Sequence, residues 1–170
     1  MRTLEERLQA VEDELSIRNL VARYTDAVNQ RDLDAFRQLW TDDSVWEIGP
    51  PLQSRADGID EIVALLRRLL QAEKYFMQMT HSGVIEIKGD RATARFVERE
   101  RGRGESTYYD SLAVYEDVLV READGWRFAE RFYRYRFLDQ SPFGGEAFPV
   151  PDANFEEHAR QTSQTIIDKR

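Results

Sequence analysis

Residues 91–100, RATARFVERE, alternate between charged side chains and smaller or apolar ones. A period of two is typical of a β-strand, because successive side chains point to opposite faces of a sheet. One face of this strand should be the more apolar, and it should hold Ala92, Ala94, Phe96, Glu98 and Glu100. Two carboxylates therefore continue an apolar face, which makes this strand a candidate wall of a binding site.

The same period runs through the second half of the chain. Further strands are predicted over residues 76–81 with 84–88, 108–121 and 126–137. Turn-forming residues separate these segments at 88–90, 101–104 and 122–125. Strands joined by such turns predict an antiparallel, strongly curved sheet.

The first half of the chain has a helical period instead. Apolar residues recur at spacings of four and three in Leu4, Leu8, Val11 and Leu15, and the stripe continues with a shift to about residue 29. Helices are also predicted over 33–39 and 59–71, with a short strand over 44–48. Helices followed by a strand meander predict an α+β fold, a cone-shaped curved antiparallel sheet with three N-terminal helices packed across its open side. The inside of such a cone is the expected small-molecule site.

The composition changes after residue 137, where proline, glycine and phenylalanine become frequent. We therefore expect one domain over residues 1–137 and a C-terminal arm and tail over 138–170. Phe143, Phe148 and Phe155 fit either a lid over the cavity or a contact with a neighbouring subunit. Together with the N-terminal stripe they exceed what a compact cone needs to cover itself, so we expect a homo-oligomer, either a dimer or a trimer.

Charge and composition exclude several classes of protein. The chain has 170 residues, a formal net charge of −8 and no cysteine, which excludes disulfides and argues against a nucleic-acid partner. No apolar run approaches the ~20 residues that span a bilayer, so we expect a soluble, cytoplasmic protein without a membrane partner. His81 and His158 lie far apart in sequence and no glycine-rich phosphate loop is present, so no metal and no cofactor are expected.

Several motifs resemble those of the SnoaL-like and nuclear-transport-factor-2-like superfamily. They are RYTDAVNQRDLDAF at 23–36, LWTDDSVW at 39–46, THSG at 80–83 and GDRATA at 89–94, with further similarity through 115–131. The resemblance implies an NTF2-like, cystatin-like roll over roughly residues 16–137. It points to the branch that holds scytalone dehydratase, bile acid 7-alpha-dehydratase and hexachlorocyclohexane dehydrochlorinase.

That branch implies a histidine base on a sheet strand, paired with an aspartate on the first helix. The histidine matches His81, whereas the aspartate position holds Asn29 here. An amide can orient an imidazole but does not stabilise its cation as a carboxylate does. The likeness to ketosteroid isomerase adds Tyr24, at the place of an oxyanion-binding tyrosine, while the aspartate base of that family falls on Ile48, which takes no proton.

The residues themselves leave alternatives open at these positions. His81 shares a predicted strand face with Met77 and Met79, so it is either a base beside an apolar cavity or a structural histidine. Glu100 either supplies the carboxylate that the first helix lacks or pairs with neighbouring arginines. Tyr24 either donates a hydrogen bond to a substrate oxygen or anchors its helix to the sheet.

Other residues are expected to line the cavity. Among them, Asp117 and Arg131 should meet across adjacent strands, either as a structural ion pair or as part of the site. The predicted substrate contacts are Trp46, Met77, Met79, Phe96, Tyr115, Asp117 and Arg131. The favoured function is a cofactor-independent lyase or isomerase that transfers a proton on a small, largely apolar cyclic or polyketide-like substrate. The alternatives are a ligand-binding or accessory protein without catalysis and a partner subunit of a larger oxygenase.

Overall fold

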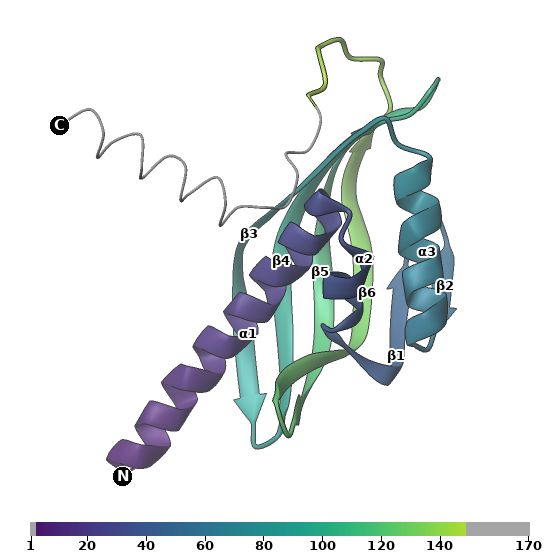
Figure 1. Cartoon of the computed structure of the whole chain (residues 1–170). Helices are drawn as coiled ribbons and strands as arrows, with labels where there is room; N and C mark the ends of the chain where they lie inside the picture. Colours follow the sequence, from purple (N-terminus) through teal and green to yellow (C-terminus); the bar gives the residue numbers. More distant parts are fainter. Residues whose placement is uncertain (1–2, 149–170) are drawn as a thin grey trace, which may run out of the picture.

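The computed structural model describes residues 3–148, which form three helices and six strands (Figure 1). In chain order these elements are α1 (Leu4–Gln30), α2 (Leu33–Arg37), β1 (Trp40–Ile48), β2 (Ser54–Asp57), α3 (Ile59–Gln71), β3 (Tyr75–Lys88), β4 (Arg91–Arg103), β5 (Tyr108–Glu122) and β6 (Gly125–Asp139). No helix within the described residues is long and apolar enough to cross a membrane.

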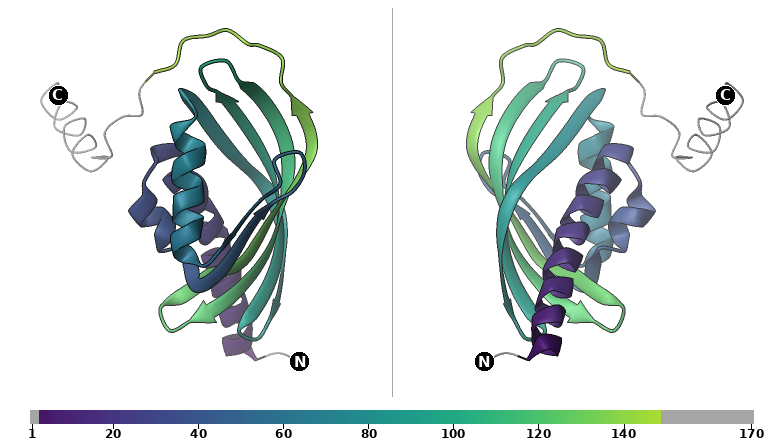
Figure 2. Two further views of the ribbon diagram at one scale, coloured as in Figure 1. Left: turned by 90° about the vertical axis from the view of Figure 1, so that its right-hand side faces the viewer. Right: turned by 90° about the vertical axis from the view of Figure 1, so that its left-hand side faces the viewer.

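The strands form one curved sheet in the order β2-β1-β6-β5-β4-β3. Strands β3 to β6 make an antiparallel meander, whereas β1 pairs with β6 in parallel and with β2 in the antiparallel sense. The sheet bends around the helices, which lie across its concave side (Figure 2). The predicted α+β fold with N-terminal helices across a curved sheet is confirmed, and the parallel pair of β1 and β6 is an exception to the expected antiparallel order.

Two predicted boundaries around β1 are wrong. The strand predicted over 44–48 begins at Trp40, because Trp40 pairs with Phe128 of β6. Residues 54–57 were not predicted as a strand, yet they pair with β1 in the sheet. Both pairings join segments whose own patterns are too short to show a period, so only the assembled sheet reveals them.

The core beneath the helices is rich in aromatic rings. Tyr24 of α1 and Phe36 of α2 pack against Trp40, Trp46 and Phe128 of the sheet, with ring centroids 5.3 to 6.2 Å apart. All five side chains are buried, and rings of this size contribute much of the apolar area that a domain removes from water. This cluster fixes α1 and α2 against β1 and β6.

The N-terminal part of α1 turns its apolar stripe away from the core. The four residues of the stripe are 55% to 78% exposed: Leu4, Leu8, Val11 and Leu15. On the opposite face of the same stretch, the Asp13 carboxylate accepts two hydrogen bonds of 2.6 Å from Arg121 and one of 3.2 Å from Trp126. The predicted stripe therefore exists but faces solvent, on a part of the helix that reaches beyond the sheet in Figure 1.

Candidate functional site

A cavity of about 460 Å³ lies between α3 and the concave face of the sheet, near the end of β6. Its walls are largely apolar, with aliphatic side chains from α3 and rings from Tyr24, Trp46, Phe76, Tyr109, Tyr115, Tyr133 and Tyr135. Leu138 and Gln140, at the start of the C-terminal arm, complete the wall. A cavity of this size and polarity suits a small, largely apolar molecule.

Tyr109 reaches this cavity because of the residue beside it in the sheet. Its partner on β4 is Gly102, and a β-carbon on Gly102 would overlap the Tyr109 ring. Glycine in a strand often marks such a close approach. The shape of the cavity wall therefore depends on the absence of a side chain at residue 102.

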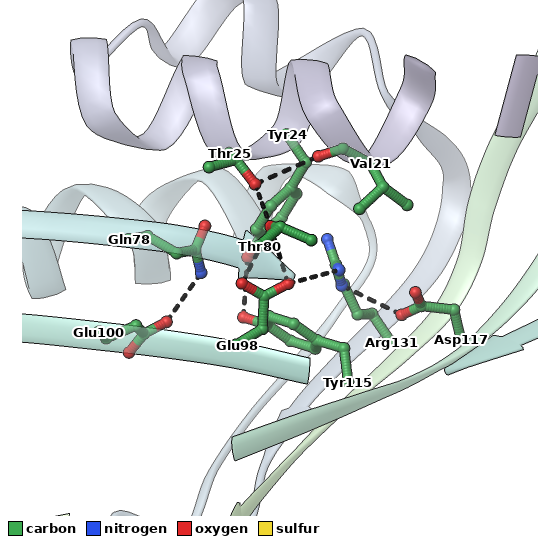
Figure 3. A network of polar contacts seen from close by, with 10 residues as sticks. All are labelled: Val21, Tyr24, Thr25, Gln78, Thr80, Glu98, Glu100, Tyr115, Asp117 and Arg131. Carbon is green, nitrogen blue, oxygen red and sulfur yellow. Dashed lines mark hydrogen bonds and ion pairs between the residues drawn. The ribbon is translucent and has the colours of Figure 1, made fainter. Parts of the chain in front are cut away.

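Glu100 carries a carboxylate into the cavity from β4. It lies opposite Gln78 of β3, whose Nε2 donates a hydrogen bond of 2.8 Å to Glu100 Oε1 (Figure 3). The Gln78 backbone is held in turn by Asn29 of α1, which donates to its carbonyl and accepts from its N–H, both at 2.8 Å. Asn29 thus fixes β3 to α1 through the backbone, and it does not orient an imidazole.

The surroundings of Glu100 change its acidity. Burial raises the pKa of Glu100 to about 6, against the lowering effects of hydrogen bonds from Gln78 and Tyr133 and of the positive charge of Arg131. Glu100 is therefore ionised at neutral pH, yet it binds a proton more readily than an exposed glutamate. A carboxylate with these properties can remove a proton from a molecule bound in the cavity.

The prediction that His81 faces the cavity is wrong. His81 is exposed, and Met77 and Met79, which were expected as substrate contacts, are each 41% exposed on the outer face of the sheet. The two methionines were correctly placed on one face of β3, but the opposite face points inward. The imidazole therefore lies on the other side of the sheet from the cavity.

Cross-strand partners explain why the polar face of β3 is the buried one. Gln78 and Thr80 lie in register with Glu100 and Glu98 of β4, and their side chains make hydrogen bonds with those carboxyl groups. Buried polar groups need such partners, so the two faces of adjacent strands had to match. The sequence did contain a signal for Gln78. It lies between Met77 and Met79, so it had to point to the opposite face of β3 from the two methionines.

Glu98 lies deeper than Glu100 and is 0% exposed. Its carboxyl oxygens lie 2.9 Å from the Thr80 hydroxyl (Figure 3). The Thr80 hydroxyl contacts the Thr25 hydroxyl, and the Thr25 hydroxyl lies 3.3 Å from the carbonyl oxygen of Val21. Each hydroxyl has a single hydrogen. If Glu98 is ionised, Thr80 donates to it and the hydrogen of Thr25 can serve only one of its two neighbours.

When Glu98 is protonated, it can donate to Thr80, Thr80 can donate to Thr25, and Thr25 can donate to the carbonyl of Val21. All three hydrogen bonds then form at once. Burial supports the same state, because it raises the pKa of Glu98 to about 8, against the opposing charge of Arg131. At neutral pH the two glutamates of β4 therefore differ: Glu98 is mostly the neutral acid and Glu100 the carboxylate.

Asp117 and Arg131 form the predicted ion pair. They are register partners on β5 and β6, with Arg131 Nε 3.0 Å from Asp117 Oδ1 and both side chains 0% exposed. The guanidinium carbon lies 3.9 Å and 3.7 Å from the ring centroids of Tyr24 and Tyr115. The hydroxyls of these two tyrosines meet at 2.9 Å, so Tyr24 also anchors its helix to the sheet.

The predicted site residues thus fall into three groups. Tyr24, Trp46, Glu100 and Tyr115 line the cavity. Behind its wall lie Asn29, Phe96, Asp117 and Arg131, and on the outer face lie Met77, Met79 and His81. Tyr109, which the sequence placed on one strand face with Tyr115, also lines the cavity, and among the residues that the sequence did not single out are Glu73, Phe76, Gln78, Tyr133 and Tyr135. Among residues 3–148, no group of three histidine, aspartate or glutamate side chains is placed to hold a metal ion.

The start of the C-terminal arm packs beside the cavity. The centroid of the Phe143 ring lies 5.6 Å from that of Tyr108 and 4.0 Å from the guanidinium carbon of Arg101. Phe155 and His158, which the sequence also singled out, lie outside the described residues. The described part of the arm therefore rests on the ends of β4 and β5.

The fold and the cavity together define a class of protein, an α+β domain with a cavity between its curved sheet and its helices. Residues 9–132 match the family described as the SnoaL-like domain. Since this match covers most of the chain, the protein belongs to the SnoaL-like family. No curated protein sequence matches the chain significantly.

Solved structures share the fold. An NTF2-like protein with a cystatin-like fold from Novosphingobium aromaticivorans is 26% identical, with a TM-score of 0.68, over 80% of this chain and 92% of that one. The type 2 hexachlorocyclohexane dehydrochlorinase LinA is 17% identical, with a TM-score of 0.74, over 86% and 99%. A scytalone dehydratase-like protein from N. aromaticivorans is 17% identical, with a TM-score of 0.71, over 85% and 97%.

Proposed function

We propose that the protein is a cofactor-independent lyase or isomerase that moves a proton on a small, largely apolar ring compound bound in the cavity. One observation carries the proposal: Glu100 is an ionised group of raised pKa within an aromatic cavity, and Gln78 holds it in place. The fold shared with a dehydrochlorinase and a dehydratase-like protein is consistent with such chemistry. His81 has no part in this reaction, because it lies outside the cavity.

The residues of the wall take distinct roles in the proposed reaction. Glu100 is the base that accepts the proton, and Gln78 is a positioning residue that fixes one carboxylate oxygen. Phenol groups at the cavity, among them Tyr109 and Tyr135, supply hydrogen bonds for a substrate oxygen as negative charge develops on it. The apolar walls exclude water, which strengthens each of these interactions.

Hydrogen–deuterium exchange at carbon tests the proposal without knowledge of the natural substrate. The probe is 2-tetralone in D₂O, a ring ketone with acidic hydrogens next to its carbonyl, followed by NMR. The protein should accelerate exchange, Glu100→Gln should lower the rate by at least ~100-fold, and His81→Ala should leave it unchanged. A rate that survives Glu100→Gln, or that is lost with His81→Ala in a folded protein, would remove Glu100 from the role of base.

A second candidate function is binding without catalysis. Asn29 favours it, because the aspartate that the family resemblance implies at this position is missing and the amide is engaged by the β3 backbone. An accessory protein of this kind would bind 2-tetralone and show no exchange above the rate of the buffer. The same experiment therefore separates the two functions.

We also propose that two copies of the chain associate through the N-terminal part of α1. The exposed stripe of Leu4, Leu8, Val11 and Leu15 has the spacing of a two-heptad coiled-coil seam. In a parallel pair, Arg7 on one flank of the stripe would face Glu12 of the other copy, so the charges would be complementary.

Sedimentation analysis tests this association. Leu8→Glu with Leu15→Glu should convert the assembly to monomers, while Val84→Glu, at an equally exposed residue of the outer sheet face, should leave its mass unchanged. Wild-type protein that sediments as a monomer, or a double variant that stays associated, would contradict the proposed contact.

A further inference from the structure

The cavity has an uneven distribution of charge. Two carboxylates line it, Glu73 from the end of α3 and Glu100 from β4, while none of the described side chains that line it is lysine, arginine or histidine. The Arg31 guanidinium lies behind this wall, where it donates to the backbone carbonyls of Leu70 and Glu73, and its charge offsets at most one of the two carboxylates. A negatively charged ligand would therefore meet repulsion with no cation in the wall to balance it.

Arg131 does not supply that cation. The rings of Tyr24 and Tyr115 line the cavity and stack on its guanidinium, so they lie between the charge and the ligand. The guanidinium is also paired with Asp117 at 3.0 Å. Asp117 therefore offsets the charge of Arg131, and what remains of its field acts on the Glu98 and Glu100 carboxyl groups.

Two hydrogen-bond acceptors of the wall lack a donor among the described residues. They are Gln78 Oε1, on a residue that is 2% exposed, and Glu73 Oε2. The orientation of the Gln78 amide follows from its Nε2, which donates to Glu100, so the oxygen is the free end (Figure 3). Buried acceptors without donors are costly, and a donor on a bound molecule would satisfy them.

The aromatic rings add to the same preference. Ring faces carry negative charge density and attract cations, and Tyr109, Tyr133 and Tyr135 surround the space next to Glu100. Carboxylates, free acceptors and ring faces all favour hydrogen-bond donors and positive charge. Each of them disfavours an anion.

We propose that the cavity selects uncharged or cationic ring compounds that carry a hydroxyl or amino donor, and that it rejects those bearing a carboxylate, sulfate or phosphate group. The donor points to Gln78 Oε1 or to Glu73. This inference rests on the proposed function only in taking the cavity as the substrate site, and it adds the chemical class of the substrate.

Equilibrium binding of three probes with one ring system tests the selection. Calorimetry at about pH 7.5 compares 2-naphthol, 2-naphthylmethylamine, which is protonated there, and 2-naphthoate, using the full chain. The naphthol and the amine should bind, and the naphthoate should bind ~100-fold more weakly than the naphthol, as expected for an unbalanced charge a few ångströms from a carboxylate at the dielectric constant of a protein site.

The variant Glu73→Gln separates charge from shape. It should weaken binding of the amine ~10-fold and strengthen that of the naphthoate by a similar factor, with little effect on the naphthol. Glu86→Gln, which removes an exposed carboxylate on the outer face of the sheet, is the matched control and should change none of the three affinities.

Equal or tighter binding of the naphthoate, no binding of either favoured probe, or a Glu73→Gln variant that behaves like the control would each overturn the inference. Binding is measured without turnover, so the absence of deuterium exchange would end the proposed catalysis and leave this selection standing. Exchange of 2-tetralone together with tight naphthoate binding would support the proposed catalysis and overturn this selection.

Discussion

The replacement Glu98→Gln should stabilise the protein, and by an amount that grows with pH. Glu98 has its pKa raised from the ordinary 4.5 to about 8, chiefly because its side chain is buried. The folded protein therefore retains this proton over a range in which the unfolded chain has lost it. The folded state loses stability as the pH rises from 4.5 to 8, and the loss is complete above that range.

The size of the effect follows from the shift. One pKa unit corresponds to about 1.4 kcal/mol, so full ionisation of Glu98 costs the folded state on the order of 5 kcal/mol relative to the unfolded chain. Glutamine resembles the protonated acid in shape, and its amide can donate to the Thr80 hydroxyl, which lies 2.9 Å from the Glu98 carboxyl group. The variant avoids the cost, so its advantage should increase by about 2 kcal/mol between pH 6 and pH 8.

Urea unfolding of both proteins at several pH values between 6 and 9 measures this difference directly. Other carboxyl groups titrate in both proteins, and to first order they cancel when the two curves are subtracted. Glu86→Gln should show no such trend, because Glu86 is exposed. A difference between Glu98→Gln and wild type that stays constant with pH within about 0.5 kcal/mol would show that Glu98 is ionised throughout, and the reasoning on its hydroxyl chain would be wrong.

Three further outcomes are expected. Asp13→Asn should lower the unfolding free energy by about 2 kcal/mol at pH 7 in urea titrations. Because the pKa of Asp13 is lowered, this contribution is present above pH 3.8 and should vanish as the pH falls below the lowered value. Gly102→Ala should displace the Tyr109 ring and weaken 2-naphthol binding about tenfold in calorimetry, whereas Gly144→Ala, in open space, should not; equal affinities would contradict the packing. The exchange rate of 2-tetralone should rise with pH as Glu100 loses its proton near pH 6, and a rate independent of pH would argue against this base.

The base that we propose differs from the one that the family resemblance implies. The resemblance implied a histidine and an aspartate, but His81 is exposed and Asn29, at the aspartate position, holds the β3 backbone at Gln78. The proposed base, Glu100, lies on the adjacent strand β4 and lines the cavity. The family thus supplies the fold and the cavity, while the groups within the cavity belong to this chain.

Much of the architecture could be predicted because strand and helix periods are local. The alternation over residues 91–100 correctly placed Ala92, Ala94, Phe96 and Glu98 on the buried face of β4. The order of helices before strands predicted the α+β class. The spacing that placed Leu4 to Leu15 on one stripe of α1 was also correct.

The local sequence does not decide which of the two faces of a strand turns towards the core. A strand with period two has two faces, and its own residues rank them only by polarity, so Met77 and Met79 seemed better suited to the interior than Gln78. The register between β3 and β4 reversed that order, because it placed Gln78 and Thr80 beside carboxyl groups that they satisfy. Side-chain periodicity therefore establishes the neighbours along one segment, whereas the site depends on pairings between segments about twenty residues apart, and these exist only once the sheet has formed and curved around its helices.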